Sequence, residues 1–146
     1  MARPRASVRG ATRPVPADAG QALVEFALVL PLLLALLIAV FEFGRAWNAY
    51  QVITDAAREG ARNAVIANPT ITEEYVRERI RDALARASLD PDNASISLSG
   101  FNDQTGSPAT VTISYPYRFV LLGPLLGWTT GRSSITLSTT FVMRNE

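Results

Sequence analysis

The residue with the clearest potential for chemistry is Glu25, a carboxylate at the start of a long apolar stretch. After it, residues Phe26–Phe41 carry no charge until Glu42. A carboxylate costs about 2.5–3.5 kcal/mol at the centre of a bilayer and less near its edge. Such a group therefore needs a stabilising environment, and that environment is the first indication of function.

Two environments for Glu25 are open. In the first, it sits at the N-terminal edge of a helix, where the helix dipole and lipid headgroups stabilise a negative charge. In the second, a peptidase cuts after Gly20 and leaves Gln21 as a new N-terminus. The carboxylate can then pair with an α-ammonium of its own chain or of a neighbour. At about 4 Å and an effective dielectric of about 20, such a pair contributes roughly 4 kcal/mol before desolvation, and it would set register in an assembly.

Four segments carry a resemblance to a known family. They are GQALVEFALVLP at residues 20–31, FEFGR at 41–45, AAREGAR at 56–62 and MRNE at 143–146. The chain resembles TadE-like proteins, the pseudopilins of tight-adherence (Flp-type) pilus systems. The resemblance implies cleavage at Gly20 and Gln21 by a prepilin-type peptidase and an assembly role for Glu25. It also implies residence in the cytoplasmic membrane or a pilus base, with other pilin-like subunits and pilus assembly proteins as partners, and no catalysis.

The apolar stretch predicts one membrane-spanning helix, marked by Phe26, Pro31 and Phe41. Extended to Ala22–Phe43, it measures about 33 Å at 1.5 Å per residue, enough for a hydrocarbon layer of about 30 Å. Pro31 removes one helical hydrogen bond and favours a kink. No small-x-small site follows the stretch, so we expect the helix to remain in the mature chain.

Charge distribution predicts the orientation. The leader, residues 1–20, holds four arginines against one acid, which places it in the cytoplasm by the positive-inside rule. We therefore expect a cleaved cytoplasmic leader at 1–20, a transmembrane helix at 21–43 and an extracytoplasmic domain at 44–146, anchored in a bacterial cytoplasmic membrane.

Composition excludes several functions. The chain has no Cys and no His, which removes thiol nucleophiles, imidazole bases and Cys/His zinc sites. Beyond residue 20, ten arginines face twelve acids, a balance unlike a nucleic-acid-binding face. We expect no catalytic residue, metal, cofactor or small-molecule substrate, and membrane lipid as a contact. The alternative function is an uncleaved, signal-anchored extracytoplasmic binding module.

Past the membrane, small and aromatic residues at three- or four-residue spacing predict that the first helix continues to Asn68–Pro69. This stripe is either the face that packs on the domain or a seam between subunits. It comprises Trp47, Tyr50, Ile53 or Thr54, Ala57, Ala61, Ala64 and Val65.

The remaining sequence predicts an α+β domain. A second helix is expected over Ile71–Ser88, with Thr70 and Glu73 forming a capping box. Three segments of period two, near residues 94–99, 109–119 and 135–143, predict an antiparallel sheet of about three strands covered by this helix. Pro116 demotes its strand locally to an edge or a bulge.

The connection at residues 119–128 is unusually apolar, and too short for a second span. Either it folds under the domain as core, or it forms an exposed patch that contacts lipid or a partner. We favour contact, because Trp128 ends a segment that no strand periodicity includes. The candidate contact residues are Leu121, Leu122, Leu125, Leu126 and Trp128.

Overall fold

The computed structural model describes residues 17–66, 68 and 70–146. The chain divides into two units, Met1–Leu37 and Ile38–Glu146. The described part of the first unit is helical throughout. The second unit contains the remaining helix α1 residues and every other element. The predicted leader, residues 1–20, lies outside the described residues except for its last four.

Helix α1 runs without interruption over Ala17–Ala64 and includes Pro31. It is the one helix in the described part of the chain that is long and apolar enough to cross a membrane. The structure ends α1 at Ala64, four residues before Asn68, because Val65 and Ile66 already leave the helix as a turn and a bend.

Helix α2 spans Glu73–Arg86, and its N-cap corrects the sequence prediction. The capping side chain is Thr72, whose hydroxyl accepts the backbone N–H of Tyr75 at 3.1 Å. Thr70 instead binds the side-chain oxygen of Asn68 through its amide and its hydroxyl. The predicted Thr70–Glu73 box is therefore wrong, because the Asn68 side chain already binds Thr70.

The sheet is antiparallel with three strands, as predicted, and the strands follow one another as a meander in the order β1-β2-β3. Its strands are β1 (Ser95–Ser99), β2 (Pro108–Arg118) and β3 (Ser134–Arg144), and the short helices are η1 (Pro91–Asn93) and α3 (Gly123–Thr130). β1 pairs with β2 only from Thr110 to Ser114. At Pro116 the central strand therefore has β3 as its one neighbour, so the local edge predicted from this proline is confirmed.

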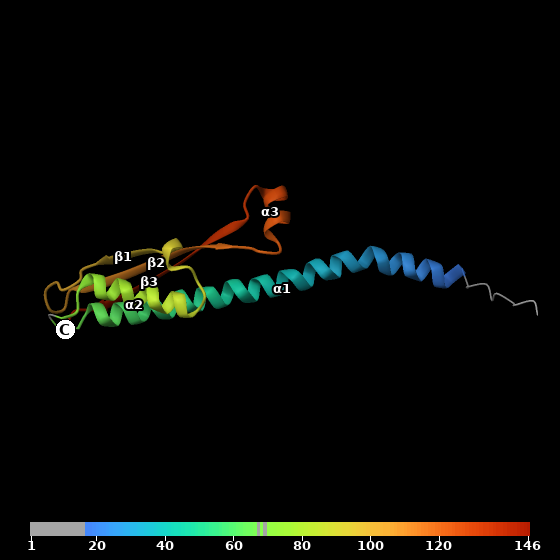
Figure 1. The fold of residues 1–146 in the computed structure, drawn as a ribbon. Helices are drawn as coiled ribbons and strands as arrows, with labels where there is room; N and C mark the ends of the chain where they lie inside the picture. The colour runs from blue at the N-terminus through green and yellow to red at the C-terminus, as the bar shows by residue number, and fades with distance from the viewer. Residues whose placement is uncertain (1–16, 67, 69) are drawn as a thin grey trace, which may run out of the picture. The chain divides into compact units, whose positions relative to one another are not determined.

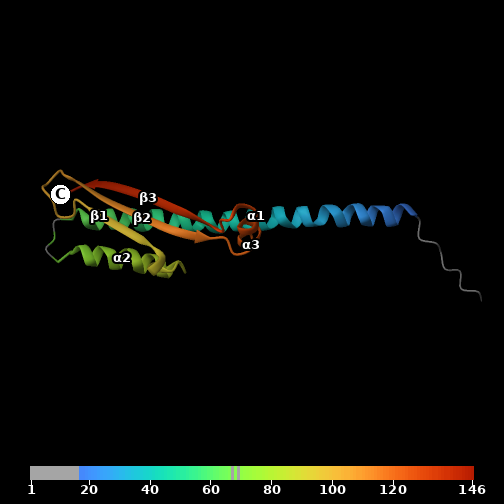
Figure 2. The ribbon, with the colours of Figure 1, turned by 90° about the horizontal axis from the view of Figure 1, so that it is seen from above.

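Helices α1 and α2 lie side by side against one face of the sheet (Figures 1 and 2). Odd-numbered residues of β2 point into this core, whereas Thr112 and Ser114 on the opposite face bond the hydroxyls of Thr140 and Ser138 at 3.0 Å. The α+β fold class is thus confirmed. The sheet is covered by α1 as well as by α2, whereas the sequence predicted the second helix as its cover.

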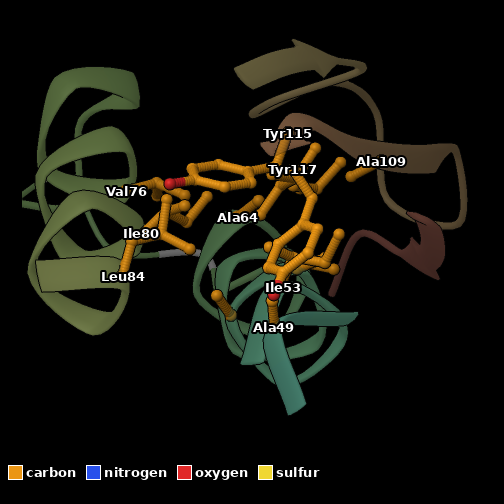
Figure 3. Close-up of a cluster of buried hydrophobic side chains, with 14 of the residues drawn as sticks. Ala49, Ile53, Ala64, Val76, Ile80, Leu84, Ala109, Tyr115 and Tyr117 are labelled. Atoms are coloured by element: carbon orange, nitrogen blue, oxygen red, sulfur yellow. The ribbon is translucent and has the colours of Figure 1, made fainter. Parts of the chain in front are cut away.

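The core contains Tyr115 and Tyr117 of β2, whose rings point to different helices (Figure 3). The Tyr115 ring extends toward α2, which contributes Val76, Ile80 and Leu84 to the core, and the Tyr117 ring extends toward Ala49 and Ile53 of α1. The α1 stripe is therefore the face that packs on the domain, the first of the two alternatives. Trp47 falls outside it and is 54% exposed, because Ala46 and Ala49 face the core instead.

Candidate functional site

The Gly20–Gln21 bond lies within α1, three residues after the helix begins. Gly20 is exposed, and a Cβ built on it would meet no atom within 4 Å. Gln21 is exposed as well. The structure therefore leaves both predicted cleavage residues open on the helix surface.

Glu25 lies one turn after Gln21 and binds it directly. The Gln21 side-chain amide donates to the Glu25 carboxylate at 3.0 Å. Residues four apart share one face of a helix, so the Gln21 side chain lies on the face that Glu25 occupies. Of the three predicted N-terminal site residues, the structure brings Gln21 and Glu25 into contact. Their use in assembly stays a prediction.

The apolar residues that follow Glu25 are exposed around the helix. Phe26 is 57% exposed and Phe41 70% exposed. Between them α1 presents a series of large apolar side chains to its surroundings: Leu28, Val29, Leu30, Leu32, Leu33, Leu34, Leu36, Leu37 and Val40. An exposed apolar surface of this length is the form that a lipid-embedded helix takes.

Glu42 is the residue whose role the sequence did not reveal. It is an acid that follows the apolar stretch, yet only 1% of it is exposed. Its carboxylate accepts the backbone N–H of Val120 at 2.9 Å and that of Leu121 at 3.2 Å. Arg45, on the same helix, lies 3.5 Å from the same carboxylate. Glu42 therefore ties the connection after β2 to α1.

A weak signal for this contact is present in the sequence. The apolar connection at 119–128 offers few side chains that could satisfy its backbone amides, and buried amides must find acceptors. Glu42 is an acid beside an equally apolar stretch. The amides of residues 119–128 need acceptors and the Glu42 carboxylate needs donors, which is a reason to pair the two segments. No local pattern in the sequence, however, identifies them as partners.

The connection itself forms helix α3, preceded by a turn. Val120 and Leu121 are each 58% exposed and Trp128 is 86% exposed, while Leu122 and Leu126 are half-buried. The side chain of Leu125, also predicted as a contact, lies outside the described part. Of the two alternatives for this segment, the exposed patch agrees with these side chains; its contact with lipid or a partner stays a prediction.

An apolar groove of about 300 Å³ lies beside this segment. Phe43 and Trp47 of α1 line one side of it, and Phe119 and Leu137 line the other. Phe43 and Trp47 stack with ring centroids 6.4 Å apart. The groove thus extends the apolar surface of α1 toward the start of the α3 connection.

Tyr117 lies close enough to Glu42 and Arg45 for their charges to act on its phenol. Its hydroxyl is buried and has no hydrogen-bond partner among the residues that the structure describes. Burial raises the pKa of the Tyr117 phenol; Arg45 opposes this effect, and the negative charge of Glu42 adds to it. The phenol therefore stays neutral over a wider pH range than an exposed tyrosine.

These features define a class of protein: a single long apolar helix, suited to anchoring in a membrane, that continues into an α+β domain. The match to a protein family agrees with this class. Residues 20–62 match the family described as TadE-like protein. Over these residues the chain is similar to TadE-like proteins, as the sequence motif predicted, and the match supports a pilin-like protein associated with a Tad pilus. No curated protein and no solved structure matches the chain.

Proposed function

We propose that this protein is a structural, non-enzymatic subunit of a Tad/Flp pilus or of a related secretion machinery. A prepilin-type peptidase would cut after Gly20, and residues 21–43 would hold the product in the cytoplasmic membrane. The leader would lie in the cytoplasm and residues 44–146 outside. The TadE-like match over the helix supports the class, and the exposed apolar surface of α1 supports the anchor.

The single observation that carries the processing proposal is the Gln21–Glu25 contact. In the uncut chain the carboxylate binds a neutral amide. After cleavage, Gln21 would carry a positive α-amino group in the same helical turn, and a charged donor binds a carboxylate more strongly than a neutral one. Cleavage would thus turn an exposed acid in an apolar helix into one half of an ion pair.

Within one helix, however, the first backbone N–H groups already stabilise a negative charge at the N-terminus. The larger gain would come when Glu25 of one subunit meets the free amino group of its neighbour inside the membrane. There the partner offsets the cost of the buried charge. Glu25 would then act as the registration group of the assembly, with other pilin-like subunits and pilus assembly proteins as its partners.

N-terminal sequencing of the protein from its native membrane tests the processing step. We expect the mature chain to begin at Gln21. A chain that keeps its leader would favour the alternative, a signal-anchored binding module, and would contradict the proposal.

A pair of substitutions tests the role of Glu25. Glu25→Val should leave membrane insertion intact and abolish co-purification with other pilus subunits. Glu74→Val, on the exposed face of α2, is the matched control and should retain co-purification. Unchanged assembly of the Glu25→Val protein would remove Glu25 from the mechanism.

A further inference from the structure

We propose that residues 119–130, the turn after β2 together with α3, form a second membrane contact that lies on the surface of the bilayer crossed by α1. We call this segment the interfacial foot. The proposal rests on the membrane anchor of the proposed function, and it assigns the foot a phospholipid surface as its binding partner.

The first argument is depth. The uncharged stretch of α1 ends at Phe41, and the next residue, Glu42, holds the amides of Val120 and Leu121. The start of the foot is therefore fixed at the level along α1 where apolar sequence gives way to charge. In a membrane-spanning helix this level is the boundary between hydrocarbon and headgroups.

The second argument is the chemistry of the exposed side chains. Val120, Leu121 and Trp128 are each more than half exposed. Trp128 is 86% exposed and presents most of its ring to its surroundings. Tryptophan is enriched at the membrane interface because its ring is apolar and its N–H is polar. In water the same set of side chains would be an unfavourable apolar patch.

The third argument is continuity with the anchor. At the level of Glu42, α1 exposes Val40, Phe41 and Phe43, which are 63–70% exposed. The apolar groove between Phe43 and Phe119 connects this surface with the foot. A bilayer surface at this depth would cover both, whereas a protein partner would need its own complementary shape at the same place.

Charge at the rim agrees with a lipid partner. Arg45 is 58% exposed beside Glu42, and Arg118 is exposed where β2 enters the foot. Arginines at the ends of apolar segments reach anionic headgroups while their stems stay in apolar surroundings. We therefore expect the foot to bind the bilayer surface more strongly when the vesicles contain phosphatidylglycerol than when they do not.

The chain contains two tryptophans, Trp47 and Trp128, which makes a fluorescence experiment direct. The Trp47→Phe protein, reconstituted in phosphatidylcholine/phosphatidylglycerol vesicles, reports on Trp128 alone. Nitroxide-labelled lipids with the label at the headgroup, at carbon 5 or at carbon 12 of the acyl chain measure its depth. We expect about twofold stronger quenching by the two shallow labels than by the deep one, because an interfacial indole lies at headgroup level.

A second single-tryptophan protein separates failure of the foot from failure of the anchor. It carries Trp47→Phe, Trp128→Phe and Leu33→Trp, so that its one tryptophan lies in the middle of the apolar stretch. Strong quenching by the deep label there, with no quenching of Trp128, would overturn the foot and leave the anchor in place. No quenching at either position would contradict the anchor as well.

Binding by a second copy is a separate outcome. If Trp128 is shielded only when the protein density in the vesicles rises, and is not quenched by lipid labels, the foot is a subunit contact and the lipid proposal is wrong. Far-UV circular dichroism of each variant checks that the fold is retained. Quenching of Trp128 by shallow labels at every protein density supports the proposal.

Discussion

The carboxylate of Glu42 accepts the backbone N–H of Val120 at 2.9 Å, although 78 residues separate the two in sequence. This contact joins the end of the apolar stretch to the connection between β2 and β3. It also buries an acid at the level where the anchor meets the domain. One carboxylate thus holds two successive amides of the domain's most apolar connection.

We predict that Glu42→Gln lowers the free energy of unfolding of the domain by about 2 kcal/mol, since hydrogen bonds to a charged group contribute about 1.5–3 kcal/mol each and glutamine keeps one acceptor oxygen. Chemical unfolding in detergent, followed by near-UV circular dichroism, measures the change. Glu74→Gln, exposed on α2, should change it by less than about 0.5 kcal/mol. Equal effects of the two substitutions would show that the Glu42 contacts contribute nothing specific.

Gly60 allows the close approach of α1 to α2. A Cβ at this position would lie 2.7 Å from the Cδ1 of Ile80 and 3.6 Å from Val111. We expect Gly60→Ala to destabilise the domain by about 1–2 kcal/mol, because overpacking outweighs the gain in helix propensity. Gly44→Ala is the control on the same helix; nothing lies within 4 Å of its Cβ, so it should be neutral or stabilising.

A double-mutant cycle isolates the Gly60 clash. Ile80→Val removes the Cδ1 atom that the new methyl group would meet. The cost of Gly60→Ala should therefore fall when Ile80→Val is already present, with a coupling energy of about 1 kcal/mol. Additive effects in thermal unfolding would show that the cost does not come from the Cδ1 contact, because valine keeps the Cγ1 atom that lies 3.0 Å from the new Cβ.

Tyr117 should make the domain sensitive to alkaline pH. Burial raises the pKa of its phenol above the ordinary value, so the folded chain holds this proton when the unfolded chain has lost it. Stability is then unaffected below the unfolded pKa of about 10 and falls as the pH rises from there toward the folded pKa.

Tyr117→Phe removes this titration and an unpartnered buried hydroxyl. We expect a neutral or slightly stabilising effect at pH 7 and a smaller loss of stability between about pH 9 and pH 11 than in the parent protein. Tyr75→Phe, at an exposed position, is the control. The prediction fails if the parent and Tyr117→Phe proteins lose stability in parallel as the pH rises.

Asn145 closes the turn between β1 and β2. Its side-chain amide donates to the carbonyls of Gly100 at 2.9 Å and Ser107 at 3.2 Å, and the residue is 6% exposed. Asn145→Ala should cost about 1–2 kcal/mol and speed hydrogen exchange in residues 100–108. Asn48→Ala, exposed on α1, should change neither. Unaltered exchange in the Asn145→Ala protein would show that the turn does not depend on this side chain.

The elements that depend on the pattern of neighbouring residues along the chain were predictable from the sequence. The apolar stretch, the TadE-like motif and the period-two segments determine the anchor, the family resemblance and the three strands, because each depends on neighbours within a few residues. The N-cap at Thr72 was missed for a related reason: Thr70 and Thr72 both fit a cap, and the Asn68 side chain, which binds Thr70, decides between them.

Only the tertiary structure decided where Glu42, Trp47 and residues 119–128 lie and how far each is buried. Sequence placed Glu42 at a membrane boundary and Trp47 on the packing stripe, and it left residues 119–128 open between core and surface. The burial of Glu42 depends on amides 78 residues away, and a long-range partner of this kind leaves no periodicity in the chain. Local composition determined which residues need apolar or polar surroundings, and the packing of distant segments determined where each residue finds them.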